Sequence, residues 1–488
     1  MAVRARLSAP RPQEDKWPWH IAAWLALPVT ALAAGERRLE AETYLHGGYG
    51  IRLALEAQRG GWARFGQISK VWQPSRLKGI QVSPEVGTPF LAATQVFDLQ
   101  PVPRKWLSLN RTEGAAERFA KPGTILVSCS GSVGRVTLAT RQHEGVLISH
   151  DLLRIEPTDQ AAGGWLYAYL RSAQVRAMMT AAHYGHVIKH IEPAHLAALP
   201  IPIPKREILD GFNHRLEDLL KKRNRTEELM REGHGLYEEA IGPVDAKGGV
   251  ALGFSVSAQA LFTGRRRLEA EFYSPAATAI LNRFRAKKLR VESLGDVTAR
   301  IWRLTQFKRV FGDEGAPYMS ADELFALNPT ITKRVVVEQA DNADDFFVKA
   351  GWIVMARSGQ TYGLNGSVAL MTKRHESAFL SDDFIRIMPH IDRIRPGYLF
   401  TALGHPTLGR PLVVRCAYGT SIPHLDPPDV AACPIVRLGS SVENTIADRM
   451  EETINLRAEA DEMENALAAD AEDLTRAFLA GDQEPFDR

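Results

Sequence analysis

The 488-residue chain contains two copies of one long segment. Residues 35–44 (GERRLEAETY) return 229 positions later as residues 264–273 (GRRRLEAEFY). Four further matches follow in the same order, at offsets between 228 and 234 residues. Repeats of this length are much longer than solenoid repeats, which span about 20–50 residues. The sequence therefore predicts two tandem copies of one folded domain.

Each copy has the sequence pattern of a mixed α/β domain. The apolar runs at residues 125–128 and 353–356 are short and follow turn residues, which is typical of buried strands. Gly/Ser-rich loops come next, at residues 131–135 and 359–366. Residues 165–179 have the apolar spacing of an amphipathic helix. The expected fold class is therefore mixed α/β.

A long amphipathic segment follows each copy. Residues 205–241 and 441–479 carry apolar residues at heptad positions, and Arg223 and Thr226 interrupt the first pattern. We expect two helices that pair as an antiparallel coiled coil, because the chain must return from the second copy toward the first. The alternative is that each helix packs only on its own domain. At ~1.5 Å per residue, each helix would be about 55 Å long.

Charge is distributed unevenly over the four expected segments, which are residues 1–204, 205–244, 245–437 and 438–488. The two domain-sized segments carry 23 and 25 basic residues against 15 and 19 acidic ones. The last segment, a helix with an acidic tail, carries 4 basic against 14 acidic residues. A basic domain attracts polyanions such as nucleic acid, although a basic surface can also be merely solvated.

An apolar stretch lies near the N-terminus, at residues 17–34. Its basic flank and Ala-rich end resemble a secretory signal or a membrane span. Pro18 and Pro28 within it, and Glu14 and Asp15 before it, argue against both. We therefore expect a buried strand or short helix and no membrane partner. Because three cysteines are too few for a disulfide framework, we expect a cytoplasmic protein.

We find no catalytic motif in the sequence. It has no GxxxxGK[ST] phosphate loop, no GxGxxG after a strand and no zinc-binding HExxH. An amino-group methyltransferase needs Asp/Asn-Pro-Pro-aromatic, and residues 426–429 (DPPD) and 328–331 (NPTI) lack the aromatic. His190 and His424 recur in both copies, but no nucleophile–base constellation recurs beside them, so we interpret them as structural.

Several of these motifs are shared with a known family. They are the run KPGTILVSCSGSVGR at residues 121–135, the run YGHVIKHIEP at 184–193 and the run PIPIP at 200–204. Together with the RLEAE-x-Y motif at 38–44 and 267–273, they resemble the specificity (S) subunits of Type I restriction–modification systems. The resemblance covers nearly the whole chain, as two target-recognition domains that are each followed by a conserved helix.

This resemblance implies a non-catalytic subunit that recognises a bipartite target in double-stranded DNA. It also implies two methyltransferase (modification) subunits as partners, which bring S-adenosylmethionine, and a restriction or translocase subunit as a further partner. The second copy departs from the pattern, with TSIPHLDP at residues 420–427 where the first has HVIKHIEP at 186–193. A Type I system and a related methylation-associated phage-defence system therefore both stay open. Two other classes also stay open: a DNA-modifying enzyme with a divergent catalytic domain, and a scaffold that does not bind DNA.

We expect the DNA contacts on loops that leave the duplicated strands. Arg can bind guanine and Gln can bind adenine with two hydrogen bonds each, and Lys can hold phosphate. The candidates in the first copy are Arg76, Lys78, Ser130, Ser132, Arg135, His186 and Lys189. The candidates in the second copy are Arg303, Gln306, Lys308, Arg309, Gln360, Thr361 and Thr420. We expect no catalytic, metal-binding or cofactor-binding residue in this chain.

Overall fold

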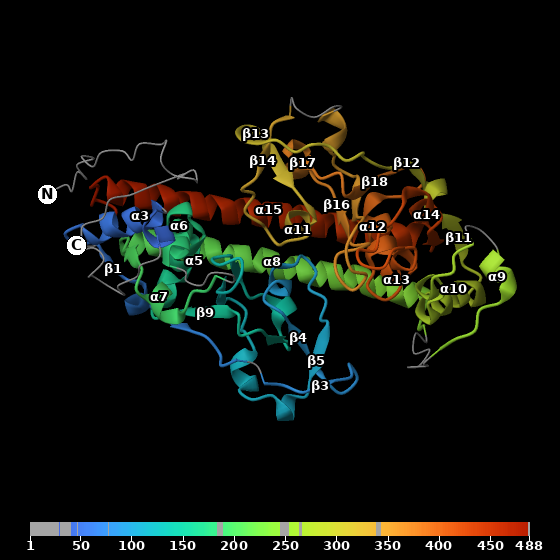
Figure 1. Ribbon diagram of the computed structural model, residues 1–488, viewed down its shortest axis with the longest axis horizontal. Helices are drawn as coiled ribbons and strands as arrows, with labels where there is room; N and C mark the ends of the chain where they lie inside the picture. The colour runs from blue at the N-terminus through green and yellow to red at the C-terminus, as the bar shows by residue number, and fades with distance from the viewer. Residues whose placement is uncertain are drawn as a thin grey trace, which may run out of the picture.

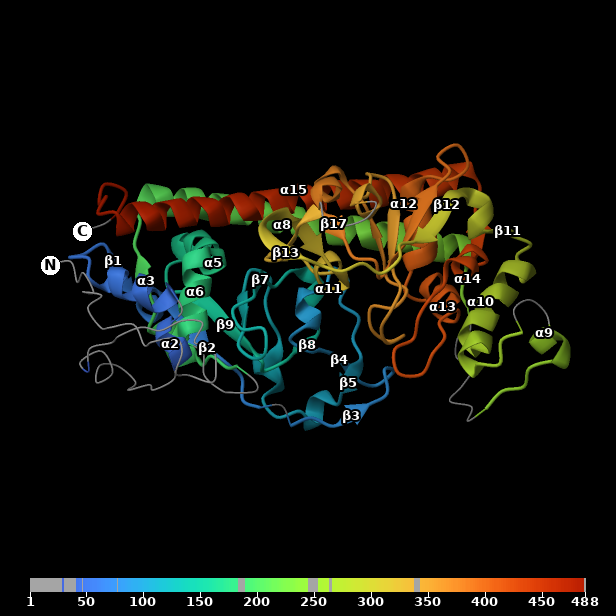
Figure 2. The same ribbon diagram turned by 45° about the horizontal axis from the view of Figure 1, so that its top comes forward.

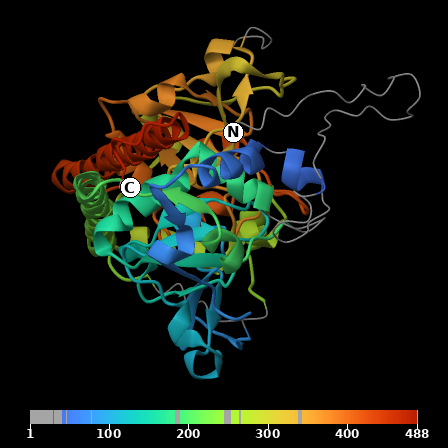
Figure 3. The same cartoon turned by 90° about the vertical axis from the view of Figure 1, so that its left-hand side faces the viewer.

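The computed structural model describes Val29 and residues 41–45, 47–76, 78–182, 189–244, 253–262, 266–337 and 343–486. Two long helices, α8 (Arg206–Ile241) and α15 (Ser440–Leu479), run side by side along the long axis (Figure 1). We call the residues before α8 the first half and the residues between α8 and α15 the second half. Both halves pack on one side of the helix pair (Figure 2). Viewed along the helices, the two halves diverge from the helix pair, with the second half above and the first half below (Figure 3).

Ion pairs between α8 and α15 show that the two helices are antiparallel. Near the start of α8, Arg215 lies 2.5 Å from Asp470, which is near the end of α15. Later in α8, Glu232 lies 3.0 Å from Arg449, which is near the start of α15. The predicted antiparallel pairing is therefore confirmed.

The buried side chains of both helices recur mainly at intervals of three and four residues, as a coiled-coil seam requires. In α8 they are Phe212, Leu216, Leu219, Arg223, Thr226, Leu229, Met230, Gly233, Tyr237 and Ile241. In α15 they are Glu443, Ile446, Ala447, Met450, Thr453, Arg457, Ala460, Glu464, Leu467, Ala471, Thr475 and Phe478. Arg223 and Thr226, which interrupt the apolar pattern of the sequence, are thus part of the buried seam.

Each half holds a four-stranded antiparallel sheet, and the strand order of the two sheets corresponds. In the first half the order is β2 (Ser69–Trp72), β9 (Leu152–Pro157), β6 (Ile125–Ser128) and β7 (Val136–Leu138). In the second half it is β12 (Thr298–Arg303), β18 (Phe384–Pro389), β15 (Ile353–Ala356) and β16 (Val368–Leu370). The two predicted buried strands are therefore present, as β6 and β15.

Smaller sheets complete each half. The first half has β3 (Gln81–Val82), β5 (Lys105–Leu107), β4 (Thr88–Leu91) and β8 (Leu147–Ile148), in that order. The second half has β14 (Arg334–Val335), β13 (Phe311–Met319) and β17 (Phe379–Leu380). Two-stranded ribbons lie next to the long helices: β1 (Trp62–Arg64) with β10 (Pro200–Pro202), and β11 (Arg290–Ser293) with β19 (Pro434–Arg437). The short helices are α2 (Ala41–Leu45), α3 (Gly47–Glu56), α4 (Phe65–Ile68), α5 (Gly163–Arg171), α6 (Ala173–Ala182), α7 (Pro193–Ala197), α9 (Ala258–Phe262), α10 (Pro275–Ala286), α11 (Ala321–Leu324), α12 (Pro396–Gly404), α13 (Arg410–Val414) and α14 (Pro427–Ala431).

A buried arginine occupies the same place in both four-stranded sheets. Arg154 donates to the backbone carbonyl of Leu152 at 2.8 Å, and Arg386 donates to the carbonyl of Leu380 at 3.3 Å. Burial lowers the pKa of each arginine to about 10. Because these arginines are 232 residues apart, within the range of the sequence offsets, the duplication extends to the polar core.

Each half packs on the helix pair through a glycine in a buried helix. A Cβ on Gly164 of α5 would lie 2.2 Å from the carbonyl oxygen of Phe212 in α8. A Cβ on Gly397 of α12 would lie 2.6 Å from the carbonyl oxygen of Ala447 in α15. Only glycine permits helix backbones to approach this closely.

The prediction of one amphipathic helix over residues 165–179 is wrong. The chain forms two helices, α5 and α6, which are separated by Ser172 in an extended conformation (ψ 152°). All residues of α5 except Arg171 are buried. They are buried on every side because α5 contacts both α8 and α15, so its apolar residues follow no one-sided pattern.

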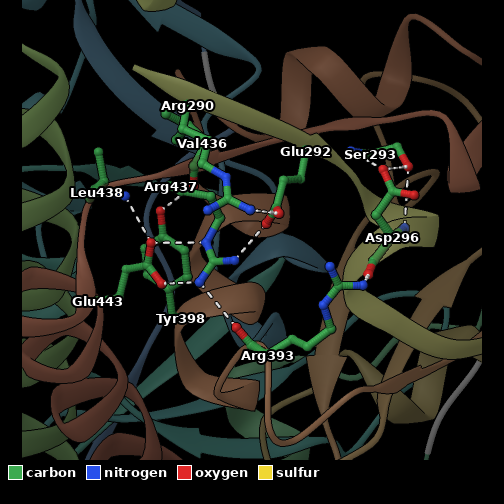
Figure 4. Close-up of polar contacts among 10 residues, drawn as sticks. All are labelled: Arg290, Glu292, Ser293, Asp296, Arg393, Tyr398, Val436, Arg437, Leu438 and Glu443. Carbon is green, nitrogen blue, oxygen red and sulfur yellow. Dashed lines mark hydrogen bonds and ion pairs between the residues drawn. The ribbon is translucent and has the colours of Figure 1, made fainter. Parts of the chain in front are cut away.

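Arg437 fixes the junction between the second half and α15 (Figure 4). Its guanidinium lies 2.6 Å from Glu292 of β11 and 2.7 Å from Glu443 in the first turn of α15. Glu443 also accepts a hydrogen bond from the backbone N–H of Leu438 at 2.8 Å. These contacts hold the β11–β19 ribbon against the start of the helix.

The end of the described chain lies beside the start of α8. The backbone N–H of Lys205 donates to the carbonyl of Pro485 at 2.9 Å, and that of Ile203 donates to the carbonyl of Gly61 at 2.8 Å. Of the apolar stretch 17–34, only Val29 is described, and its side chain is 79% exposed. Among the described residues, no helix combines the length and apolarity that a membrane span needs.

Candidate nucleic-acid interface

In the second half, one end of the four-stranded sheet collects most of the predicted contacts. The register pairs Arg303, at the end of β12, with Ile385, at the start of β18. It also pairs Phe384 with Ala356, the last residue of β15. The segments that follow β12 and β15 therefore leave the sheet at the same end. Both carry predicted contacts: Arg303, Gln306, Lys308 and Arg309 on the first, and Gln360 and Thr361 on the second.

Three interactions hold these loops in place. The side-chain amide of Gln360 donates to the carbonyl of Ser421 at 2.9 Å, which brings the loop with Thr420 to the same end of the sheet. Arg410 donates to the carbonyl of Thr361 at 3.1 Å and to two further carbonyls of this loop. Arg309 lies 2.6 Å from Asp382. Lys308, Gln306 and Arg303 are exposed.

The first half has the same arrangement at the corresponding end of its sheet. Trp72, at the end of β2, pairs with Arg154, and Ser128, at the end of β6, pairs with Leu152. The predicted contacts Arg76 and Lys78 follow β2, and Ser130 and Ser132 follow β6. The backbone N–H of Gly131 donates to the carbonyl of Lys189 at 3.0 Å, so Lys189 lies beside this loop. His186 lies outside the described residues.

Arg135 has different surroundings from the other candidates. Its guanidinium carbon lies 4.3 Å from the centre of the Phe97 ring, and the residue is half-buried. Burial lowers its pKa, and the carboxylates of Asp98 and Asp322 act in the opposite direction. Arg135 therefore lies toward the contact between the two halves, and its role in DNA binding stays a prediction.

The two halves contact each other directly, which the sequence did not predict. The backbone N–H of Leu99 donates to the carbonyl of Phe325 at 2.9 Å, and that of Leu327 donates to the carbonyl of Phe97 at 2.7 Å. We call this pair of hydrogen bonds the inter-half bridge. Asp98 lies within it, and burial raises the pKa of Asp98 to about 6. The bridge sets how one sheet end is placed relative to the other.

A buried polar cluster joins both halves to both long helices. Glu464 of α15 accepts hydrogen bonds from Tyr167 of α5 and from Asn328 of the second half. Arg223 of α8 lies 3.0 Å from Glu464 and 2.5 Å from Asp461. Burial raises the pKa of Glu464 well above its usual value.

The cluster is completed by Arg374 of the second half and Arg171 of α5. Arg374 lies 2.5 Å from Asp461 and donates to the side-chain oxygen of Asn328 at 2.9 Å. Arg171 lies 3.8 Å from Glu464. We call these seven residues the central polar cluster. The sequence contained a signal for it, since Arg223 occupies a heptad core position where an apolar residue is the rule.

His190 and His424 occupy equivalent places next to the sheet ends. Ser358 lies 2.7 Å from the Nδ1 atom of His424 and donates to Asp383 at 2.5 Å. In the first half, Ser130 and His190 form an isolated backbone bridge. The Ser358–His424 contact joins side chains, whereas the Ser130–His190 bridge joins backbone atoms, so these two contacts do not make a nucleophile–base constellation that recurs in both halves. Because Ser358 lies between the histidine and the carboxylate, it connects two loops rather than facing a base that a carboxylate orients. Within the described ranges, no group of His, Cys, Asp and Glu side chains is arranged to hold a metal ion.

No family model matches the sequence, and no curated protein matches it. Solved structures that are similar to the chain include specificity subunits of Type I restriction–modification systems. One is the S subunit from M. genitalium, with 14% identity, 89% coverage of this chain, 99% of that chain and a TM-score of 0.31. Another is the HsdS subunit from Thermoanaerobacter tengcongensis, with 14% identity, 87% and 98% coverage and a TM-score of 0.26.

A third similar chain comes from a structure that describes complex assembly and conformational transition of the type I R-M system. It has 14% identity, 86% coverage of this chain, 97% of that chain and a TM-score of 0.25. Identity and TM-score are low in all three comparisons.

Proposed function

We propose that the chain is a DNA-binding specificity subunit that recognises a bipartite target. The observation that carries this proposal is the duplicated sheet end, which carries Arg, Lys and Ser side chains in the first half and Arg, Lys, Gln and Thr side chains in the second. The halves correspond to target-recognition domains at residues 1–204 and 245–437, with conserved helices at 205–244 and 438–488. Because the two loop sets differ in sequence, the two half-sites differ as well.

Each sheet end supplies two kinds of contact. Exposed lysines such as Lys78 and Lys308 bind phosphates, which gives affinity without sequence information. Arg303, Gln306 and Gln360 reach base edges, where Arg selects guanine and Gln selects adenine. The carboxylates of residues 438–488 repel phosphates, so α15 does not contact the DNA. The DNA contacts are made by the two sheet ends.

The chain directs partner enzymes and has no catalytic role of its own in this proposal. The antiparallel helix pair relates the two halves by an approximate two-fold axis, and this gives two similar surfaces for two methyltransferase subunits. These subunits bring S-adenosylmethionine, and a restriction, translocase or other defence subunit can join them. The assembly works on double-stranded DNA in the cytoplasm.

Methylome sequencing tests the proposal. Cells with the chain and its partner methyltransferase should carry a methylated motif of two different short half-sites separated by a fixed non-specific spacer. Cells without the chain should lack this motif. A single continuous motif would contradict bipartite recognition. DNA binding that does not weaken with salt would instead support a scaffold that makes no phosphate contacts.

A further inference from the structure

A cavity of about 380 Å³ lies where the two halves and α15 meet. The first half contributes the segment from Asp98 to Arg104, next to the inter-half bridge. The helix α15 contributes Ile454, Arg457, Ala458 and Asp461, and the second half contributes the remaining walls. This volume lies within the ~300–1,000 Å³ range of small-molecule sites.

Arg457 is a buried cation that lines this cavity. Its residue exposure is 8%, and among the described residues it has no hydrogen bond and no ion pair within 4.0 Å. Glu227 and Asp461 attract it electrostatically from beyond that distance, and Arg223 repels it. Burying a guanidinium without a partner costs free energy, which a bound counter-ion would offset. The cavity is the space from which such a counter-ion can reach Arg457.

The other charged groups of the cavity leave an excess of positive charge. Asp461 is already paired with Arg223 and Arg374. Arg104 and Arg334 are exposed at the cavity and have no ion pair within the described ranges. Asp98 and Glu323 are the acidic groups that oppose them. Glu323 accepts a hydrogen bond from the backbone N–H of Ser320, and the pKa of Asp98 of about 6 keeps it partly protonated in mildly acidic solution. An anionic occupant is therefore favoured.

Much of the remaining lining is apolar. Leu324, Phe325, Val368, Leu370 and Phe400 line the cavity, and all five are buried. An inorganic anion would satisfy Arg457 but would leave this surface without a partner. The lining therefore suits an occupant with an apolar or aromatic body attached to its anionic group.

We propose that this cavity binds a small organic anion whose carboxylate, phosphate or sulfonate group faces Arg457. The apolar body of the ligand lies against Phe325 and Phe400. Because the walls come from both halves and from α15, the ligand stabilises one arrangement of the two sheet ends. The proposal goes beyond DNA recognition and does not depend on it.

The binding of two fluorescent probes to the full chain tests this proposal. The anionic probe is 1-anilinonaphthalene-8-sulfonate, and the neutral probe is N-phenyl-1-naphthylamine, which has the same aromatic body without the sulfonate. The anionic probe should bind at one saturable site and more tightly than the neutral one. Arg457→Met should weaken the anionic probe about ten- to hundred-fold, the range for losing a hydrogen-bonded charge, and should leave the neutral probe unchanged.

A matched variant controls for effects on α15. Arg449→Met removes an arginine of the same helix that pairs with Glu232 and does not line the cavity, so it should leave both probes unchanged. If circular dichroism shows that Arg457→Met does not fold, the exposed pair Arg104→Met and Arg334→Met replaces it, with a smaller expected loss. Equal affinity of the two probes, or unchanged binding of the anionic probe in Arg457→Met, overturns the proposal.

A competition experiment with DNA distinguishes a free organic anion from a DNA phosphate as the occupant of the cavity. A short non-specific duplex should leave the bound anionic probe in place, and Arg457→Met should bind the duplex as the unmodified chain does. If the duplex displaces the probe and Arg457→Met weakens duplex binding, the occupant of the cavity is DNA. That result overturns the small-molecule proposal while leaving the proposed DNA-binding function intact.

Discussion

The Cα atom of Gly164 faces the backbone of Phe212 so closely that an added methyl group would lie 2.2 Å from the Phe212 carbonyl oxygen. This contact joins α5 to α8 and thereby joins the first half to the helix pair. Backbone atoms of a long helix cannot move aside for one methyl group without disturbing the seam with α15.

Gly164→Ala should therefore destabilise the protein. Overpacking a tight contact costs about 1–3 kcal/mol, and displaced backbone can raise this value. Gly235→Ala in α8 is the control, because a Cβ there meets nothing within 4 Å. The control should be stabilised by about 0.5–1 kcal/mol, since alanine favours a helix more than glycine does. Urea unfolding of both variants measures the difference, and equal stabilities would contradict the close packing.

Asp98 should make stability depend on pH. Its folded-state pKa is about 6 because of burial, whereas an unfolded Asp titrates near 3.9. The folded state therefore holds the proton more tightly, and stability falls as pH rises from about 4 to about 6 and stays reduced above that. Arg104 and Arg135 lower this pKa, and Asp322 raises it.

Asp98→Asn removes this dependence. At pH 7.5 the variant should be more stable than the unmodified chain by up to about 3 kcal/mol, since one pKa unit corresponds to 1.36 kcal/mol. Near pH 4 the two should have the same stability. Asp344→Asn, at an exposed position, is the control and should follow the unmodified chain at every pH. Parallel stability–pH curves for Asp98→Asn and the unmodified chain would show that Asp98 titrates normally.

Glu464 should be important for attaching both halves to the helices. Glu464→Ala leaves Arg223, Tyr167 and Asn328 buried without this partner, and breaking a buried ion pair costs about 3–5 kcal/mol. Glu464→Gln keeps an acceptor of the same shape, so it should cost less. Glu462→Ala, exposed on the same helix, should change stability by less than about 0.5 kcal/mol. Thermal unfolding of the three variants gives this order, and equal effects of Ala and Gln at position 464 would contradict it.

Lys308 should contribute to DNA affinity without affecting the recognised sequence. Lys308→Ala should weaken binding to all duplexes to a similar extent and reduce the slope of affinity against salt by about one phosphate contact. Lys349→Ala is the control, because Lys349 is an exposed lysine at the opposite end of the same sheet, just before β15. Fluorescence anisotropy of a labelled duplex over a series of salt concentrations measures the DNA affinity of both variants. The same salt slope for both would show that this end of the sheet does not meet phosphates.

The helix pair should set the distance between half-sites only together with the inter-half bridge. The helix α5 packs on α8 at Phe212, and α12 packs on α15 at Ala447, close to the Arg449 that pairs with Glu232 of α8. Phe212 and Glu232 are 20 residues apart along α8, which is a rise of about 30 Å at ~1.5 Å per residue. Inserting one heptad after Thr226 of α8 and at the facing turn of α15 adds about 10 Å, or about three base pairs at ~3.4 Å each.

This insertion must also break the two hydrogen bonds of the inter-half bridge, because a backbone hydrogen bond does not extend by that distance. We therefore expect a longer spacer in the methylome together with a lower midpoint of thermal unfolding. A soluble insertion variant with an unchanged spacer would show that the helices do not determine the distance.

The features predictable from the sequence were those with a local or repeated signal. The strands β6 and β15 are short apolar runs after Gly turns, and the antiparallel helix pair follows from heptads placed after each copy. The duplication itself was visible in the order of the motifs. Each of these signals lies within a few dozen neighbouring residues or recurs at one nearly constant offset.

The missed features depend on long-range contacts. No local pattern connects Phe97 with Leu327, or Asn328 with Glu464, so the inter-half bridge and most of the central polar cluster have no signal in a single sequence. The helix α5 was missed in part because burial on all sides removes the one-sided spacing that marks an amphipathic helix. The motif at residues 121–135 predicts a DNA contact at Arg135, yet the position of Arg135 beside Phe97 depends on a segment that is far from it in the sequence.

The hydrogen bond between Lys205 and Pro485 has a consequence for how a gene for this protein can be arranged. It places the end of the described chain beside the start of the first long helix, next to Gly61 and Ile203. A short peptide could join the end of α15 to the first half, while the chain is opened between α8 and the second half. In such a circular permutant the second half would be synthesised before the first, and the same two helices would still pair. The fold thus fixes which half packs where, without requiring that either half be encoded first.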